Sequence, residues 1–593
     1  MLNTDTRNSQ LGTEDIIWNL ADLYPNEAAL EADVEWCRKA AVDLNTTWRG
    51  RIAGSSAAEL LALVGALEHL DSRLGRLDAY AFLNFCTQTD NAEAGALHQR
   101  ITELCSECAA LTIFFRLEWN ALPEAAAETL LAAPEPAPYR HYLATLRRYA
   151  PHQLSEAEEK ILLEQQPVGR ASWNTLFEKI FSQMKFGENG RGEEEVLSDL
   201  HQPERQTRQR AAQEMTAALR ANGHILSHIF NTLAADKMLD DKRRRYPGWL
   251  SAMNLGNQVE DRVVTTMISV ICSRYDLVAR YYRWKKKALG YDQLFDYDRY
   301  APLPDLAMAE IPWGECRRMV LAAFAGFSRQ LHDIAKTFFD KGWIHARLRH
   351  GKRGGAFAHP VEPTAHPYLL VNYTGAWRDV ETVAHEMGHG VHQVLAAGQG
   401  YYGGDTPLVL AETASVFAEL LLFNQRLREL DQPASRAALV AGKLESIFAT
   451  VFRQTAMNRF EERMHLGRRE RGELSAEDFS RHWLETQRQM FGDAVTLTED
   501  YGLWWGYIPH FLATPGYVYS YAFGELLTLS LYGRYQEEGE SFIGKYLDLL
   551  AAGGSRSPGD LLAPLGFDLG DAAFWRCGIA LIESYMEALE GDC

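Results

Sequence analysis

Two histidines and a glutamate stand at a spacing that suits binding of a metal ion. In the segment Val383-Ala-His385-Glu386-Met-Gly-His389, the histidines are four residues apart. On a helix, residues at this spacing lie one turn apart on the same face, so two imidazole nitrogens can converge on one ion. Glu386 follows the first histidine and would project to one side of the ion. Its carboxylate could there accept a proton from a bound water.

The surrounding residues predict that this segment is a helix. Apolar residues recur in it at helical spacing and indicate an amphipathic, buried helix; they are Val380, Val383, Met387, Val391 and Val394. The pattern H-E-x-x-H on such a helix is typical of zinc peptidases. His392 lies one turn beyond His389. A packing or orienting role is the better interpretation of His392, because three ligands on one straight helix seldom converge.

A catalytic zinc site needs a third protein ligand and one open position. The glycine-rich stretch Gly398–Asp405 can reverse the chain, and Thr406-Pro407 then predicts the start of a new helix. The apolar run from Leu408 carries only two acids in its first four turns, and such acids are costly to bury unless they are paired or bound to a metal. We expect Glu412 to be the third ligand. Glu419 either orients a ligand histidine through its second ring nitrogen or is a solvated surface residue.

Composition and charge narrow the class of protein. The 593 residues include 60 Lys and Arg against 79 Asp and Glu, a formal net charge of −19 that would repel nucleic acid and anionic membranes. No stretch approaches the roughly 18 uninterrupted apolar residues of a membrane span, and the polar N-terminus predicts no secretory signal. Eight scattered cysteines suit reduced thiols in a cytoplasmic protein. The pair Cys105 and Cys108 is interpreted as helix-borne buried thiols.

Most of the chain has helical periodicity, and one short region differs. The segments Gly354–Pro360 and His366–Tyr373 are aromatic and β-branched between Gly and Pro, and predict two strands of a small sheet just before the metal-binding helix. A polar, glycine-rich stretch, Gly187–Glu195, predicts a hairpin or loop. We expect a domain boundary near residue 200, which gives an N-terminal helical domain over 1–200 and a catalytic domain over 201–593.

The motif and its surroundings resemble a known family. His385-Glu-Met-Gly-His389, followed by Glu412-Thr-Ala-Ser, resembles the oligoendopeptidase F branch of the thimet oligopeptidase family of zinc metallopeptidases. The likeness covers essentially the whole chain and includes the segments Trp18–Pro25, Pro367–Gly375, Ile508–Phe511 and Tyr517–Ala522. The resemblance implies a mainly α fold, a multi-lobed helical body with a deep substrate channel and zinc on the channel floor. It also implies substrates that are short, unstructured peptides, because the channel would exclude folded proteins.

The same resemblance implies roles for residues near the end of the chain. In the family, a histidine and nearby tyrosines bind the substrate carbonyl and stabilise the oxyanion, which carries over to His510, Tyr517 and Tyr521. The wider family has two tyrosines three residues apart, whereas here Tyr517, Tyr519 and Tyr521 alternate by two. On a helix Tyr517 and Tyr521 would share a face, so we prefer that pair; which hydroxyl donates stays open.

The residues and the resemblance together predict a zinc-dependent endopeptidase of oligopeptides with one zinc per chain. His385, His389 and Glu412 would hold the zinc, and Glu386 would act as general base. An extended substrate could add to the edge of the small sheet near residues 356–373. Two alternatives stay open: a helical peptide-binding protein with structural zinc, and a zinc carboxypeptidase of related architecture. Neither the cleavage preference nor the oligomeric state follows from the sequence.

Overall fold

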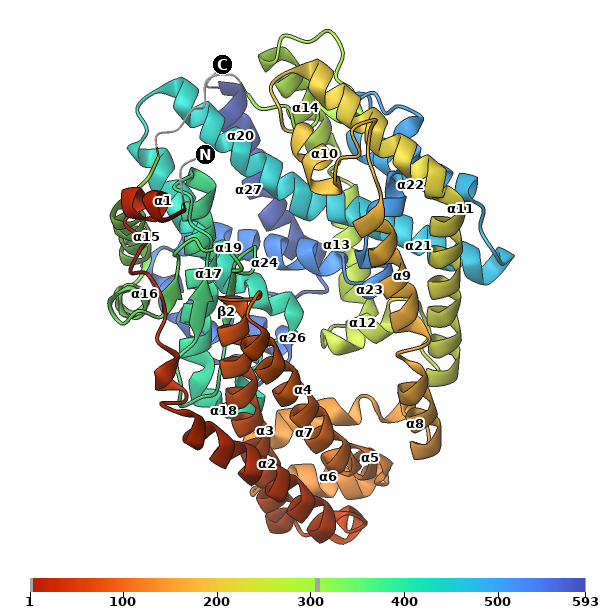
Figure 1. The fold of residues 1–593 in the computed structure, drawn as a ribbon, viewed down its shortest axis with the longest axis vertical. Helices are drawn as coiled ribbons and strands as arrows, with labels where there is room; N and C mark the ends of the chain where they lie inside the picture. The colour runs from red at the N-terminus through yellow and green to blue at the C-terminus, as the bar shows by residue number, and fades with distance from the viewer. Residues whose placement is uncertain (1–3, 304–309, 592–593) are drawn as a thin grey trace. The chain divides into compact units, whose positions relative to one another are not determined.

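A computed structural model describes residues 4–303 and 310–591, and it is built mainly from α-helices (Figure 1). The prediction of a mainly α fold is therefore confirmed. The chain forms two compact units, each assembled from three separate stretches. The first unit holds the described residues 4–153, 310–429 and 534–567, and the second holds 154–303, 430–533 and 568–591. A functional boundary near residue 200 stays a prediction.

The first unit contains the N-terminal helices and α17, the helix that carries His385 and His389. Its α-helices are α1 (Thr4–Leu11), α2 (Glu27–Trp48), α3 (Ala57–Cys86), α4 (Ala92–Thr112), α5 (Phe114–Ala121), α6 (Glu124–Ala132), α7 (Arg140–Arg147), α15 (Trp313–Phe327), α16 (Arg329–Asp340), α17 (Trp377–Ala396), α18 (Gly400–Gly404), α19 (Leu408–Glu429), α25 (Glu540–Ala551) and α26 (Pro558–Leu562). Helix α17 packs against α19 and against the small sheet.

The second unit is built mainly from helices joined by turns and loops. Its α-helices are α8 (Glu156–Gln165), α9 (Arg170–Gln183), α10 (Glu193–Asp199), α11 (Arg205–Arg244), α12 (Ser251–Gly256), α13 (Asp261–Cys272), α14 (Asp276–Ala288), α20 (Pro433–Ile447), α21 (Gln454–Arg471), α22 (Ala476–Phe491), α23 (His510–Ala513), α24 (Tyr519–Glu538, whose last turn is counted with the first unit) and α27 (Ala572–Gly591). A π-helical turn, Phe448–Arg453, joins α20 to α21. The predicted loop after α9 is a tight hairpin, in which Phe186 pairs with Arg191.

The small sheet has three strands in the order β1-β3-β2. Strands β2 (Phe357–His359) and β3 (Tyr368–Leu370) fall inside the two predicted segments and pair antiparallel, with Ala358 opposite Leu369. Strand β1 (Ile344–His345) pairs parallel to β3 and was not predicted, because two residues are too short to show an alternating pattern. The sheet lies beside α17, as predicted, and β2 forms one of its two edges.

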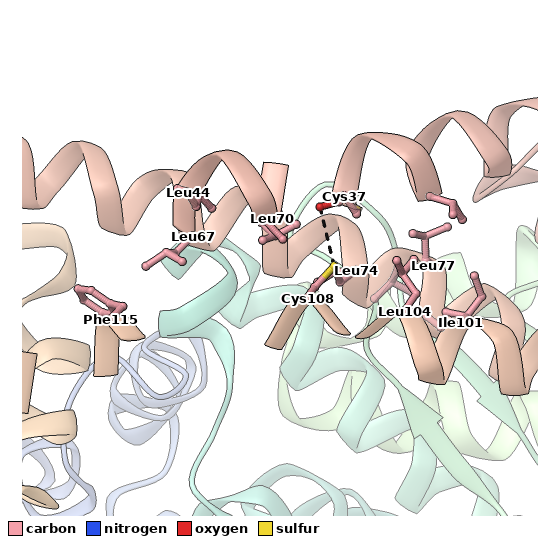
Figure 2. Close-up of a cluster of buried hydrophobic side chains, with 14 of the residues drawn as sticks. Cys37, Leu44, Leu67, Leu70, Leu74, Leu77, Ile101, Leu104, Cys108 and Phe115 are labelled. Atoms are coloured by element: carbon pink, nitrogen blue, oxygen red, sulfur yellow. Dashed lines mark hydrogen bonds between the residues drawn. The ribbon is translucent and has the colours of Figure 1, made fainter. Parts of the chain in front are cut away.

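The long N-terminal helices α2, α3 and α4 bury a common apolar core (Figure 2). Cys108 lies within this core and directs its thiol toward the carbonyl oxygen of Cys37, 3.8 Å away. Cys105, on the same helix, is half-buried, and the seven cysteines of the described part of the chain are all free. Both residues lie on α4 as interpreted, and Cys108 is buried, whereas Cys105 is only partly buried, so the expected burial holds for Cys108 alone.

Helix α19 is long and apolar enough to cross a membrane by length and composition. Within the fold, however, 67% of its apolar window is buried, which is the behaviour of a core helix. Its start after Thr406-Pro407 agrees with the predicted helix start, and the Leu410 N–H donates to the carbonyl oxygen of Pro407 at 2.8 Å. The apolar character of α19 therefore reflects its place in the core of the first unit.

Candidate active site

Helices α17 and α19 bring the three predicted ligand residues together. The Nε2 atoms of His385 and His389 lie 3.4 and 3.5 Å from the same carboxylate oxygen of Glu412. One ligand atom from each of the three residues lies within 4.8 Å of the other two. The two imidazole rings are 4.9 Å apart and nearly perpendicular. This arrangement of two nitrogens and one carboxylate oxygen suits a divalent metal ion.

Gly388 allows the two helices to approach this closely. A Cβ atom built on Gly388 would lie 2.5 Å from the carbonyl oxygen of Ala414 and 2.6 Å from Cα of Ser415. Both of these are backbone atoms of α19, so they cannot move aside as a flexible side chain would. Gly388 therefore sets the separation of α17 and α19, and with it the distance from the two histidines to Glu412.

Glu419 holds His385 from the side away from the cluster. Its Oε1 atom lies 2.6 Å from Nδ1 of the His385 ring. Because an ionised carboxylate only accepts, Nδ1 carries the proton in this pair and Nε2 is directed toward Glu412. Burial disfavours the charged imidazole, but the hydrogen bond and charge of Glu419, with the charge of Glu412, raise the pKa of His385 to about 9.

The other two members of the cluster are also held by α19. The Ser415 hydroxyl donates to Oε2 of Glu412 at 2.7 Å. His389 has a hydrogen bond with the backbone of Ala411, although burial is the largest influence and lowers the pKa of the His389 ring. Helix α19 thus supplies the Glu412 carboxylate and also groups that orient Glu412 and His389.

Glu386 is the buried acid beside the cluster. Only 6% of it is exposed, and burial raises the pKa of Glu386 to about 7, with the charge of His385 opposing the shift and that of Glu412 adding to it. A hydrogen bond with the backbone of Ala358, the middle residue of β2, also favours the ionised form. A carboxyl group with a pKa near neutrality can both accept and release a proton at physiological pH.

His392 is buried one turn beyond His389 and lies outside the cluster of ligand atoms. Burial lowers the pKa of its ring, and the nearby His389 acts in the same direction. Because the His392 ring lies outside the cluster, its position agrees with the expected packing role.

His510, Tyr517 and Tyr521 also lie together, in the second unit. His510 Nε2 is 3.3 Å from the Tyr521 hydroxyl, the rings of Tyr517 and Tyr521 meet edge to face at 4.9 Å, and the rings of His510 and Tyr517 are nearly parallel at 6.1 Å. Tyr519 is fully buried, and its hydroxyl accepts from Asn257 at 2.8 Å. Tyr517 lies in the turn before α24, whereas Tyr521 lies within the helix. The two rings therefore meet across a contact between turn and helix, and do not share one helix face as the sequence predicts.

Sequence reasoning missed two residues of this region. Gly388 is visible as a glycine inside a helix, but only the partner helix shows why a side chain is excluded there. Ser415 lies three residues after Glu412, and this spacing, which places the two side chains on one helix face, is the signal in the sequence that could identify it.

Comparisons with known proteins agree over most of the chain. A family model described as peptidase family M3 matches residues 199–580, and one described as oligopeptidase F matches residues 118–186. Oligopeptidase PepF of Bacillus subtilis is 26% identical, with 98% of this chain and 88% of the relative covered. Group B oligopeptidase PepB of Streptococcus agalactiae is 25% identical, with 97% and 96% covered.

Solved structures share the fold. A chain from Chlamydophila abortus is similar with a TM-score of 0.87 at 25% identity, covering 98% of both chains. The oligoendopeptidase-F structure from Enterococcus faecium is similar with a TM-score of 0.70 at 22% identity, covering 95% of this chain and 97% of that one. The mainly α fold of this chain is therefore found in other solved proteins.

Proposed function

We propose a function for this chain on the premise that it belongs to peptidase family M3 and is a metallo-oligopeptidase that acts on peptides. We infer that it is a zinc-dependent endopeptidase, which hydrolyses internal bonds of short, unstructured oligopeptides. The observation that carries this proposal is the convergence of His385, His389 and Glu412 on one point, with Glu386 beside them.

The residues present fit a catalytic zinc ion. Two imidazole nitrogens and one carboxylate oxygen are a common ligand set for catalytic zinc, and three protein ligands leave one position for water or substrate. His385, His389 and Glu412 would hold one zinc per chain. When bound, zinc supplies a Lewis acid that polarises the scissile carbonyl and makes water more acidic. Cobalt or manganese can substitute in such a ligand set.

Glu386 is proposed as the general base and acid. Its buried carboxyl group, with a pKa near 7, would accept the proton of the attacking water and deliver it to the nitrogen of the leaving amine. Glu419 would keep His385 in the tautomer whose Nε2 can bind the ion, and Ser415 would hold Glu412 in place.

His510, Tyr517 and Tyr521 are proposed to donate hydrogen bonds to the developing oxyanion. Burial lowers the pKa of His510, so its ring is neutral at pH 7 and retains one N–H donor. An oxyanion donor is commonly worth about 3 kcal/mol of transition-state stabilisation. This assignment rests on the family likeness and on the contacts among the three side chains.

An extended peptide substrate is proposed to pair with the edge strand β2. The carbonyl oxygen of Ala358 accepts a long hydrogen bond, 3.4 Å, from Nε2 of Gln393. A substrate N–H would replace this bond at little cost, and recognition of the main chain would give broad sequence tolerance. The deep channel, the restriction to short peptides and a cytoplasmic location remain parts of the proposal.

Substitution of the base tests the function directly. Glu386→Gln should retain one zinc per chain and lose at least about a hundredfold in turnover of a quenched fluorescent peptide, because general-base catalysis contributes that much or more. Glu381→Gln, an acid-to-amide change on the same helix, is the matched control and should keep its activity. Retained turnover in Glu386→Gln would remove Glu386 as the base.

A chelator separates the enzyme from a protein with structural zinc. The proposal expects a chelator to stop turnover while circular dichroism shows that the helical fold survives. Unfolding on metal removal, without hydrolysis in the loaded protein, would favour a closed structural site.

A further inference from the structure

One buried acid holds the turn that carries Tyr517. Glu461, on α21 of the second unit, is fully buried, and its Oε1 accepts from the backbone N–H of Gly516 at 2.6 Å. Gly516 directly precedes Tyr517 in the chain. The position of this hydrogen bond, one residue from the tyrosine, means that a shift of the Gly516 backbone would also move the Tyr517 ring.

The turn itself admits no side chain at this position. Gly516 has a φ of +83°, and an added Cβ would lie 2.8 Å from a methyl carbon of Leu250. The Tyr517 N–H donates to the carbonyl oxygen of Thr514 at 3.1 Å, and the Ser520 N–H donates to that of Tyr517 at 2.9 Å. Backbone hydrogen bonds therefore connect the turn at Gly516 directly to the first turn of α24.

Glu461 makes this contact in surroundings that are costly for a carboxyl group. Its Oε2 atom has no hydrogen-bond partner within the described residues, and His465 Nε2 lies 3.7 Å from Oε1. Burial raises the pKa of Glu461 to about 8, while the Gly516 N–H and the charge of Lys237 oppose the shift. An apolar residue would pack there without this cost, so the Gly516 contact is what the acid contributes.

A second side chain holds the same segment further from the tyrosine. Arg170 donates to the carbonyl oxygens of Leu512 and Ala513 at 2.8 and 3.4 Å. These carbonyls belong to the end of α23, the short helix that begins at His510. Arg170 and Glu461 thus hold the two ends of one segment, and Glu461 holds the end that adjoins Tyr517.

We propose that Glu461 is a positioning residue, which fixes the Gly516 N–H and thereby places the Tyr517 ring against His510 and Tyr521. The inference rests on the proposed function, in which these side chains stabilise the oxyanion. Either an ionised or a protonated carboxyl group can accept from Gly516, so the acceptor oxygen, and not the charge, is what matters. Glutamine should therefore replace Glu461, whereas methionine, of similar size without an acceptor oxygen, should not.

The test reads the place of Tyr517 without relying on activity. 3-Fluorotyrosine incorporated at position 517 reports its surroundings by ¹⁹F NMR. Glu461→Met should shift this resonance, Glu461→Gln should leave it in place, and Met464→Ala, a buried substitution on the same helix, should leave it in place as well. If Glu461→Met does not fold, Glu461→Asp, which withdraws the carboxyl group by one methylene, should produce a smaller shift.

Kinetics then connect the position to catalysis. Glu461→Met should lower kcat about tenfold with KM within about twofold, because misplacement of a catalytic group affects the transition state most. In a Tyr517→Phe background the same substitution should have no further effect. An unmoved ¹⁹F resonance in Glu461→Met, or an equal loss in the Tyr517→Phe background, would overturn the proposal. Full activity of Tyr517→Phe would instead refute the oxyanion role of Tyr517, while the ¹⁹F shift would still decide the positioning.

Discussion

Nδ1 of His385 lies 2.6 Å from Oε1 of Glu419, seven residues beyond Glu412 on the same helix. Two turns of α19 therefore supply a carboxylate to the ligand cluster and a second carboxylate to the rear of one ligand histidine. Because the carboxylate accepts a hydrogen bond from Nδ1–H, Nε2 is the nitrogen of His385 that can bind an ion.

Removal of the Glu419 charge should weaken metal binding. We expect Glu419→Gln to lower zinc affinity about tenfold or more, since it leaves a less basic and less firmly oriented His385. Competition with a chromophoric chelator measures the change. Glu429→Gln, at the end of the same helix, is the control and should match the unsubstituted protein. Equal affinities in the two variants would mean that Glu419 does not support the ligand.

Loss of the third ligand should have a larger effect. Glu412→Ala removes the carboxylate whose Oε2 lies 3.4 and 3.5 Å from the two histidines. We expect the purified variant to lack stoichiometric zinc by elemental analysis and to have no measurable turnover. A full complement of zinc would show that another residue is the third ligand.

Widening the gap between α17 and α19 should weaken the same site. Gly388→Ala would place a methyl group 2.5 Å from a backbone oxygen of α19, and overpacking of this kind costs about 1–3 kcal/mol. We expect lower thermal stability together with weaker zinc binding, because the histidines move away from Glu412. Differential scanning fluorimetry and chelator competition measure the two effects.

A second glycine provides the control for this substitution. Gly314 lies in helix α15 of the same unit, and an added Cβ there meets no atom within 4 Å. Gly314→Ala should leave zinc affinity unchanged and raise stability slightly, as alanine favours helices over glycine. If Gly388→Ala bound zinc as tightly as Gly314→Ala, the separation of the helices would not control the site.

The ligand residues of this site could be predicted from the sequence because each is marked by the residues close to it in the chain. The spacing of His385 and His389 and the apolar stripe around them specify one helix face, and an isolated acid at Glu412 in an apolar run is unusual wherever the helix packs. The two strands before α17 were found from their composition and flanking residues.

The remaining features depend on contacts between distant segments. The short strand β1 exists only because β3 pairs with it, and the constraint on Gly388 exists only because Ala414 and Ser415 lie opposite. Whether Glu419 faces His385 or solvent could not be decided from the sequence, since 34 residues separate them. The burial of Glu461 against Gly516 is likewise a property of the folded second unit.

The buried acid Glu461 should make stability depend on pH. Its pKa is raised from the ordinary value of 4.5 to about 8, so the folded state holds the proton more tightly than the unfolded chain. The contribution of protonated Glu461 to the free energy of unfolding is full below about pH 4.5 and is lost progressively as pH rises to about 8. Glu461→Gln cannot ionise and should therefore gain in denaturation midpoint, relative to the unsubstituted protein, between pH 6 and pH 8.5.

The titratable groups beside Glu461 are present both in the unsubstituted protein and in Glu461→Gln. His465, whose pKa burial lowers to about 3, and Lys237, on α11, titrate in each, so the difference between the two curves isolates Glu461. A constant difference between pH 6 and pH 8.5 would contradict a raised pKa for Glu461.

Mass spectrometry of the fragments from one unmodified oligopeptide tests the central claim most directly. Digestion by the zinc-loaded protein, with Glu386→Gln as the blank, should produce complementary fragment pairs from cuts at internal bonds. Stepwise loss of residues from the C-terminus alone would identify a carboxypeptidase, and an intact peptide would contradict hydrolysis by the His385, His389 and Glu412 site altogether.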